Sequence, residues 1–463
     1  MTRRFFLAGA PALLIGAPRG REAKLTSLTY EFQDFRYRTP YKFGGKEVDR
    51  VTMLNVQCTL TGRDGRTAQG IGSMPMGNVW SFPSATMPYD RTLGAMKTLA
   101  ESIAKLTRAY TDYAHPIDLN WDLEPAYLKA AAAISGEMHL DAPIPKLCVL
   151  VTASPFDAAI HDAYGKLHGR SVFQCYSAEF MGHDLSHYLG KEYKGEYVDR
   201  YVRALPVPEL PIYHSAGASD PIAPEDVKKP IGDGLPENLP EWIRYNGLTN
   251  IKIKLNGDDL KWDVERVLHI DKVAMQAKPQ EWLYSLDFNE RCPNVAYLLE
   301  FLKQVKEKAP VCFNHIQLIE QPTKRDLAKD RANVMHEAAK YRPVVIDESL
   351  VDQETLMLAR EMGYTGAAMK ACKGQSHSML MAAVAQKYKM FLCAQDLTCP
   401  AASFVHSATL AAHIPGVAGL EANAREYVPV ANREWEKRLP EIFVIRDGRM
   451  KTRVLTSPGL IPA

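Results

Sequence analysis

The second half of the chain repeats one pattern, in which a short apolar run ends in a polar residue and a helical stretch follows. Eight runs of this kind are candidate strands, and they are Leu210–Ser215, Asn250–Leu255, Glu281–Asp287, His315–Glu320, Pro343–Asp347, Gly366–Lys370, Lys389–Ala394 and Val417–Glu421. Alternation of strand and helix implies a parallel sheet, and eight units in series predict an α/β fold of the (β/α)8-barrel type. An open doubly wound sheet is the alternative. That fold usually carries a glycine-rich phosphate loop after its first strand, which this sequence lacks.

The run Asn250–Gly257 places two lysines on one face of a strand. Ile and Lys alternate with a period of two, so Lys252 and Lys254 point the same way. Two adjacent ammonium groups each disfavour the charged form of the other. The pattern therefore predicts anionic groups opposite them.

Three later strand-like runs end in the carboxylates Asp287, Glu320 and Asp347. Adjacent barrel strands lie about 5 Å apart, so these groups are expected to converge at the C-terminal mouth of the barrel. Three carboxylates sharing a site need a cation, and all-oxygen ligation favours Mg²⁺, with Mn²⁺ as an alternative.

Lys370 ends a run four strands beyond Lys254 in the predicted barrel. Nearby cations and carboxylates shift a lysine pKa in opposite senses, so such a lysine can be set to exchange a proton. A substrate carboxylate at the metal would have its α-proton between Lys254 and Lys370, while the metal and Lys252 would stabilise the enediolate that forms.

Five short motifs occur in order along these strand ends: Lys-x-Lys at the second, Asp-x-Asn at the third, Glu-Gln-Pro at the fourth, Asp-Glu-Ser at the fifth and Lys-x-x-Lys-Gly at the sixth. The set resembles the enolase superfamily, specifically the mandelate racemase/muconate lactonizing enzyme family, and within it most nearly the muconate-lactonizing-enzyme subgroup. The resemblance covers nearly all of residues 25–463. A Lys or His base working with Mg²⁺ on an enediolate is the established chemistry of this superfamily.

The resemblance implies roles for single residues. Asp287, Glu320 and Asp347 would hold Mg²⁺, Lys254 and Lys370 would act as acid and base, and Lys252 would assist electrostatically. Residues expected to contact the substrate or to support the site are Asn289, Gln321, Glu348, Lys373, Asp396 and Glu421. Of these, Glu348 is the second-choice metal ligand, and Asp396 is interpreted either as a substrate contact or, preferably, as a solvated loop acid.

The resemblance also implies a domain plan: an N-terminal α+β capping domain (22–205), a barrel carrying the active site (206–428) and a C-terminal segment (429–463) that returns to the capping domain. Within the capping domain, a helix is expected to begin with a Ser154 cap and end at Gly169. Two apolar loops, Tyr37–Gly44 and Ser73–Pro83, are expected to face the substrate, which predicts a substrate with some apolar surface.

Two departures from related branches narrow the choice of substrate. Dipeptide epimerases carry Asp-x-Asp at the eighth strand end, where this chain has Glu421-Ala-Asn423. Sugar-acid dehydratases use a His at the seventh strand, which here ends Cys393-Ala-Gln-Asp396 without one. Racemisation, epimerisation, syn-elimination and cycloisomerisation stay open. A dehydratase or a non-catalytic carboxylate-binding protein is the alternative function.

Residues 1–21 resemble an export signal, because Arg3-Arg4 precede a short apolar run in a twin-arginine-like pattern. A periplasmic location is expected, or a cytoplasmic one if this interpretation fails. The net charge of +2 argues against nucleic acid as a partner, and the body of the chain has no 18-residue apolar run to span a membrane. Eight cysteines without a Cys-x-x-Cys pair are expected to be buried apolar residues. The expected partner is a small carboxylate, and self-association is left open.

Overall fold

The structure is a computed structural model that describes residues 20–43 and 46–462. The predicted export signal therefore lies almost entirely outside the described residues, as does Gly44 at the end of one predicted loop. No helix among the described residues is long and apolar enough to cross a membrane.

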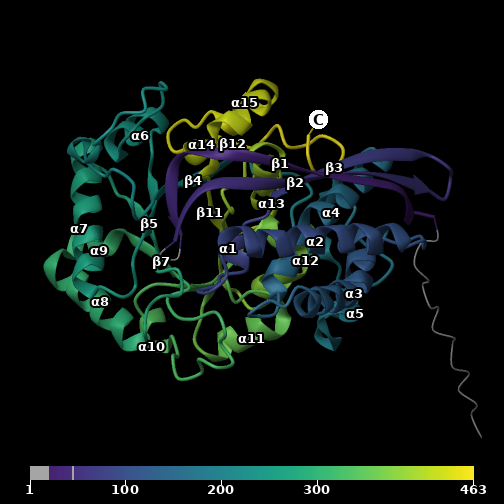
Figure 1. The fold of residues 1–463 in the computed structure, drawn as a ribbon, viewed down its shortest axis with the longest axis horizontal. Coiled ribbons are helices and arrows are strands. Elements are labelled where there is room, and N and C mark those ends of the chain that lie inside the picture. Colours follow the sequence, from purple (N-terminus) through teal and green to yellow (C-terminus); the bar gives the residue numbers. More distant parts are fainter. Residues whose placement is uncertain (1–19, 44–45, 463) are drawn as a thin grey trace, which may run out of the picture.

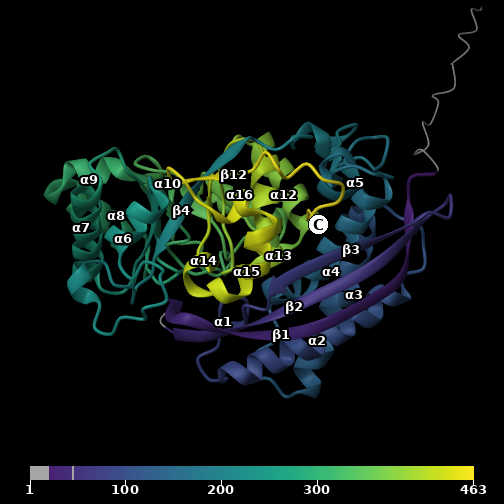
Figure 2. The same ribbon diagram turned by 90° about the horizontal axis from the view of Figure 1, so that it is seen from above.

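A three-stranded antiparallel sheet with order β1-β2-β3 begins the chain, and its strands are β1 (Ala23–Phe43), β2 (Lys46–Gly62) and β3 (Thr67–Pro75). Its strands are long, and β1 and β2 run across the molecule as one ribbon (Figures 1 and 2). The helices of this region are α1 (Asn78–Ser81), α2 (Tyr89–Ala109), α3 (Pro116–Glu137), α4 (Lys146–Leu167) and α5 (Ser186–Leu189), with one-turn 3₁₀ helices η1 (Val172–Gln174), η2 (Lys191–Tyr193) and η3 (Val198–Arg200).

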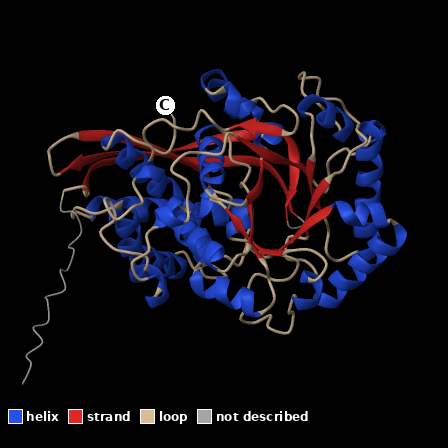
Figure 3. Cartoon of the chain, turned by 180° about the vertical axis from the view of Figure 1, so that it is seen from behind, coloured by secondary structure: helices blue, strands red, loops and turns tan. Residues whose placement is uncertain are grey.

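Eight parallel strands form a closed barrel, because β11 pairs with β4 as well as with β10. The strands are β4 (Glu209–Ala216), β5 (Asn250–Lys254), β6 (Leu283–Asp287), β7 (Ile316–Glu320), β8 (Val344–Ile346), β9 (Gly366–Met369), β10 (Phe391–Ala394) and β11 (Val417–Glu421). Figure 3 shows these strands inside a ring of helices. The predicted fold class, an α/β barrel with an N-terminal capping domain, is confirmed.

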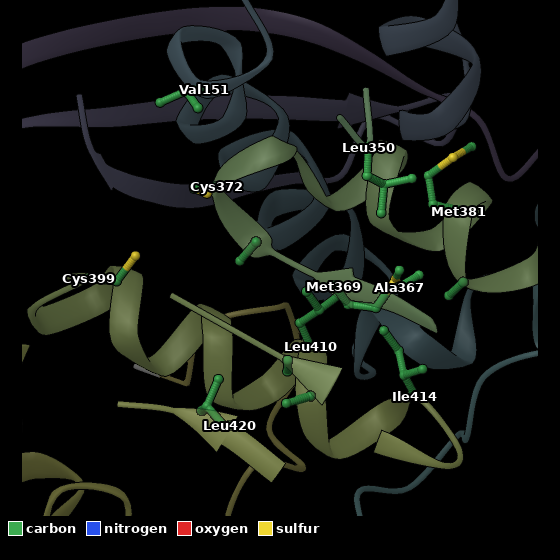
Figure 4. Close-up of a cluster of buried hydrophobic side chains, with 14 of the residues drawn as sticks. Val151, Leu350, Ala367, Met369, Cys372, Met381, Cys399, Leu410, Ile414 and Leu420 are labelled. Carbon is green, nitrogen blue, oxygen red and sulfur yellow. The ribbon is translucent and has the colours of Figure 1, made fainter. Parts of the chain in front are cut away.

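The helices around the barrel are α6 (Leu239–Asn246), α7 (Leu260–Ala277), α8 (Val295–Lys308), α9 (Pro310–His315), α10 (His336–Ala339), α11 (Gln353–Glu361), α12 (Gln375–Lys387), α13 (Ala401–His413), α14 (Ala424–Tyr427), α15 (Pro429–Arg438) and α16 (Pro440–Phe443), with η4 (Pro224–Asp226) and η5 (Ala371–Lys373). Their apolar faces pack on the strands, and one such cluster, with Met369, Leu410 and Leu420, is drawn in Figure 4. All eight cysteines are buried and free, as predicted.

The C-terminal segment contacts both halves of the molecule. Strand β12 (Arg449–Lys451) pairs antiparallel with β4, the first barrel strand. Beyond it, the backbone amides of Leu460 and Ile461 donate to the Oδ1 atom of Asp162 on α4, at 2.9 and 3.0 Å. The last residues thus bind the capping region, while β12 extends the barrel sheet.

Two local predictions were wrong. Helix α4 begins at Lys146 instead of Ser154, and it continues through Pro155. Pro155 cannot bond the carbonyl four residues earlier, but the Ser154 hydroxyl donates to that carbonyl, on Val151, at 2.8 Å. The serine that resembled a helix cap therefore compensates for the proline inside the helix.

The second error concerns the two predicted loops. Residues 37–43 belong to β1, where Tyr41 pairs with Val48 of β2 after a shift in register. The segment Ser73–Pro83 ends strand β3 and then forms the short helix α1. Residues 41–43 of the first segment and 73–75 of the second pair with β2, although the aromatic and glycine content had indicated irregular structure.

Two glycines allow α4 to lie directly on β3. A Cβ atom at Gly72 would come within 1.9 Å of the Pro155 carbonyl oxygen, and one at Gly70 within 2.2 Å of the Ala159 carbonyl oxygen. Since both contacts are with backbone, neither can be relieved by a side-chain rotation.

We expect Gly72→Ala to destabilise the protein by about 1–3 kcal/mol, because the helix must move away from the sheet. Guanidinium-induced unfolding followed by circular dichroism measures the change. The matched control is Gly94→Ala in α2, where an added Cβ meets nothing within 4 Å and the alanine should be neutral or stabilising. Equal effects of the two substitutions would contradict this packing argument.

Candidate active site

A cavity opens at the C-terminal ends of the barrel strands, beneath β1, β2 and α1. It holds about 630 Å³ of empty space, open solvent at its mouth included, which suits a small molecule. Ten of the predicted site residues line it, and they are Lys252, Lys254, Asp287, Asn289, Glu320, Asp347, Glu348, Lys370, Asp396 and Glu421. The two others, Gln321 and Lys373, lie buried directly behind it.

Lys252 is buried among three carboxylates. Its Nζ atom lies 3.1 Å from Asp287 Oδ2, 2.8 Å from Glu320 Oε2 and 2.8 Å from Glu421 Oε2. The parallel register explains this convergence, since Asp287 lies opposite Glu320 on the adjoining strands β6 and β7. Lys254 also forms an ion pair with Asp287, which stands opposite it in the register of β5 and β6.

On the opposite side of the barrel, Asp347 forms ion pairs with two lysines. Lys370 Nζ lies 2.7 Å from Asp347 Oδ2, and Lys373 Nζ lies 3.2 Å from Asp347 Oδ1. Lys373 also donates to the backbone carbonyl of Asp347 at 2.5 Å. The 3₁₀ turn η5, which follows β9, brings both lysines to one carboxylate.

The indole of Trp80 on α1 covers this side of the cavity. Its Nε1 donates to Glu348 Oε1 at 3.0 Å, and Lys370 Nζ lies 4.4 Å from the centre of its ring. The other oxygen of Glu348 is buried and has no hydrogen-bond partner among the described residues. The capping region thereby contacts one predicted catalytic lysine and one predicted ligand.

Hydrogen bonds with neighbouring residues hold the three proposed metal ligands in place. The backbone N–H of Asn289 donates to Asp287 Oδ1 at 2.8 Å, and Gln395 donates to Glu320. The side-chain oxygen of Gln321 accepts the backbone N–H of Asp347 at 3.0 Å. Asn289 and Gln321 both have positive φ, a strained conformation that often marks functional sites.

The preferred interpretation of Asp396 as a solvated loop acid was wrong. The side chain is buried at the cavity wall and accepts the backbone N–H groups of Thr398 and Cys399, at 3.1 and 3.2 Å. Burial, together with the charge of Glu421, raises the pKa of Asp396 to about 8. The loop after β10 folds inward, which sequence polarity alone could not indicate.

Burial and mutual repulsion act on the carboxylates. Burial, then the charges of Asp287 and Asp347, raises the pKa of Glu320 to about 8. Burial and the charge of Asp347 also raise the pKa of Glu348 well above its usual value. For Lys252, burial lowers the pKa, but the surrounding carboxylates outweigh it and the net shift is upward.

The chemistry of these donors fits a hard cation. The cavity and its wall contain six carboxyl groups and, with Lys373, four lysines. If all ten groups were ionised, the net charge would be −2. Within residues 20–43 and 46–462, no three carboxylate, His or Cys side chains stand at metal-binding spacing, because lysine ammonium groups lie between them. The oxygen donors, the excess of carboxyl groups over lysines and the unpartnered Glu348 oxygen nevertheless suit a divalent ion.

Three further residues of the site are Trp80, Gln395 and Tyr41; sequence reasoning missed Gln395, and it placed Trp80 and Tyr41 only within the two segments expected to face the substrate. Tyr41 lies on β1, and Lys254 Nζ is 5.9 Å from the centre of its ring. Gln395 immediately precedes Asp396, so its place at a strand end was a usable signal. Trp80 and Tyr41 come from the capping region, and no pattern within their own segments indicates which barrel residues they meet.

Comparison with known proteins places this arrangement in a family. Residues 235–460 match the family model described as "Enolase C-terminal domain-like". No curated protein matches the chain. Muconate lactonizing enzyme from Pseudomonas fluorescens is a similar solved structure, with 18% identity, a TM-score of 0.61 and coverage of 95% of this chain and 96% of that one.

Two epimerases are similar to the same degree. L-Ala-D/L-Glu epimerase from Bacillus subtilis has 15% identity and a TM-score of 0.60, and covers 95% of this chain and 98% of its own. Dipeptide epimerase from Methylococcus capsulatus, complexed with Mg and a dipeptide, has 16% identity and a TM-score of 0.60. The match covers 95% of this chain and 99% of that one. The barrel region therefore matches the enolase C-terminal domain-like family model, and the chain has the fold of the muconate lactonizing enzymes and epimerases, as its motifs predicted.

We expect Lys252→Met to destabilise the protein by about 3–5 kcal/mol in buffer containing a chelator, because Asp287, Glu320 and Glu421 lose their shared ammonium group. Denaturant unfolding measures the loss. Lys437→Met is the control, since Lys437 and its partner Glu434 are both exposed and their pair should contribute nothing measurable. A Lys252→Met protein as stable as the control variant would show that the buried network does not depend on this lysine.

Proposed function

We propose that the protein is a Mg²⁺-dependent enzyme that removes the proton α to a substrate carboxylate, through an enediolate. The observation that carries the proposal is the position of Lys254 and Lys370 on opposite sides of one carboxylate-lined cavity. Lys254 ends β5 and Lys370 follows β9, four strands away around a closed barrel of eight. Two ammonium groups facing each other across a buried cavity suit proton transfer at either face of a carbon atom.

Asp287, Glu320 and Asp347 are the residues proposed to hold the metal, with Glu348 beside them. A bound Mg²⁺ would supply Lewis-acid stabilisation of the substrate carboxylate as charge develops on it. The related dipeptide epimerase from Methylococcus capsulatus was solved with Mg, which supports this choice of ion.

The lysines differ in what they can do. Lys252 has three carboxylate partners, so it is held in place as a fixed positive charge. Lys254 loses stabilisation of its charged form to burial and gains more from Asp287, so its pKa is raised and it keeps its proton in this arrangement. It is therefore protonated here, and it can accept a proton only after its contact with Asp287 is broken.

The wall above the lysines points to the kind of substrate. Tyr37, Tyr41, Val51 and Trp80 present aromatic and aliphatic surface to the cavity. This favours a carboxylate with an apolar portion over a bare polyol acid. Glu421 is already engaged by Lys252, and with Asn423 next to it this strand end lacks the paired acids of dipeptide epimerases.

Proton exchange tests the reaction. We expect the protein with Mg²⁺ in D₂O to incorporate deuterium at the α-carbon of an acid in a library of apolar α-substituted carboxylates, as followed by NMR. Lys254→Met and Lys370→Met should each lower the rate on at least one enantiomer by about 10²–10⁴-fold, because each removes one proton carrier. The control is Lys437→Met on the surface. Tight binding of an acid without exchange would identify a carboxylate-binding protein instead.

Metal binding is tested separately by stability. At a Mg²⁺ concentration 100 times its Kd, the protein should gain about 2.7 kcal/mol in resistance to unfolding. Asp347→Asn should abolish most of this gain, because the variant removes one of three proposed ligands, while Glu434→Gln on the surface should keep it. No stabilisation by either Mg²⁺ or Mn²⁺ would contradict the proposed site.

A further inference from the structure

A second concavity lies outside the barrel, between α6, α14, α15, α16 and the β1 segment that begins at Arg36. It holds about 1710 Å³ of empty space, open solvent included. Figures 1 and 2 show α14 and α15 near the ribbon formed by β1 and β2. We call this concavity the side groove.

Exposed apolar side chains gather in the side groove. Nine large hydrophobic residues are exposed among the described residues, and four of them line it: Ile231, Tyr245, Val430 and Val444. Their exposed fractions are 42%, 55%, 46% and 47%. Single exposed apolar residues are ordinary, but a contiguous group in a groove indicates a surface that binds something.

The same groove is lined by five arginines, and three of them lack a carboxylate partner. Arg36 and Arg38 form ion pairs with Asp49 and Asp233. The three others, Arg425, Arg433 and Arg446, form no ion pair with any described residue, and Glu436 is the one acid in the lining that is not paired with an arginine of the groove.

Arg425 is the most informative of the three. Its guanidinium is half-buried, and it donates only two long hydrogen bonds, both 3.4 Å, to Asn246 Oδ1. Burial lowers its pKa to about 10. The charges of Glu436 and Glu426 act on this guanidinium from a distance, but neither carboxylate forms an ion pair with it, so the position favours an anion in direct contact.

We propose that the side groove binds an anionic molecule with an apolar body, such as an alkyl carboxylate, with its anionic group at Arg425 and its apolar part along Tyr245, Val430 and Val444. Arg433 and Arg446 strengthen the positive potential at the mouth of the groove. The two acids that line the groove, Asp233 and Glu436, are outnumbered by its five arginines.

The side groove adjoins the candidate active site. Tyr37 of β1 forms part of the wall of both spaces. Its ring lies 6.2 Å from that of Tyr427, which belongs to the same short helix as Arg425. A molecule in the groove would thus lie one side chain away from the catalytic cavity, although the groove proposal does not depend on the proposed reaction.

The test uses decanoate as the probe and isothermal titration calorimetry on the full chain. We expect decanoate to bind with an affinity that falls as salt rises, and decyltrimethylammonium, of equal chain length and opposite charge, not to bind. Arg425→Gln should weaken decanoate binding at least tenfold. Arg433→Gln and Val430→Asp, at exposed positions where folding is not at risk, should each weaken it measurably.

Two controls separate the groove from the active site. Arg200→Gln removes an exposed arginine that is paired with Glu196 elsewhere, and it should leave decanoate binding unchanged. Lys370→Met alters the catalytic cavity, and it should retain binding in the groove. The proposal is overturned if decanoate does not bind, if the ammonium probe binds equally well, or if Lys370→Met abolishes binding while the three groove variants keep it.

Discussion

The burial of Lys252 among three carboxylates is the interaction on which the rest of the site depends. Taking these charges out of water costs several kcal/mol per ion, and only close contacts between opposite charges offset that cost. The barrel meets this condition because Asp287 and Glu320 are in register on β6 and β7, and the long side chain of Lys252 reaches both of them and Glu421 from β5. The network holds more acid than base, which is why the site suits a further cation.

Much of this could be predicted from sequence. The barrel followed from repeated strand and helix runs, and the pairing of Lys252 and Lys254 with carboxylates followed from two-residue periodicity and from strand ends that must meet. These patterns are local, and each determines which side chains lie at the C-terminal ends of the strands. The fold is confirmed, and the described structure brings all twelve predicted site residues to one cavity or its wall, although their roles stay predictions.

The errors arose where distant segments decide the outcome. Asp396 was interpreted as a solvated loop acid because it lies beyond a strand end, yet the loop turns inward against the barrel. Ser154 looked like a helix cap because serine favours that position. The helix nevertheless extends through Ser154 and Pro155, because burial of α4 against β3 favours one long helix. Trp80 and Tyr41 reach the cavity only because the capping region lies over the barrel, and no short pattern encodes that docking.

The hydrogen bonds of Asp162 on α4 affect the order in which the chain folds. Its two oxygens accept the backbone N–H of Ile71 from β3 and those of Leu460 and Ile461 from the last turn of the chain. A nascent chain can join β3 to α4 early. The Oδ1 atom of Asp162, however, gains its hydrogen bonds only from residues synthesised some 300 positions later. The N-terminal region therefore completes its hydrogen bonds only when the barrel and the tail have been made. Ribosome-bound chains that stop short of Leu460 should hold an incompletely satisfied Asp162 in an otherwise assembled interior.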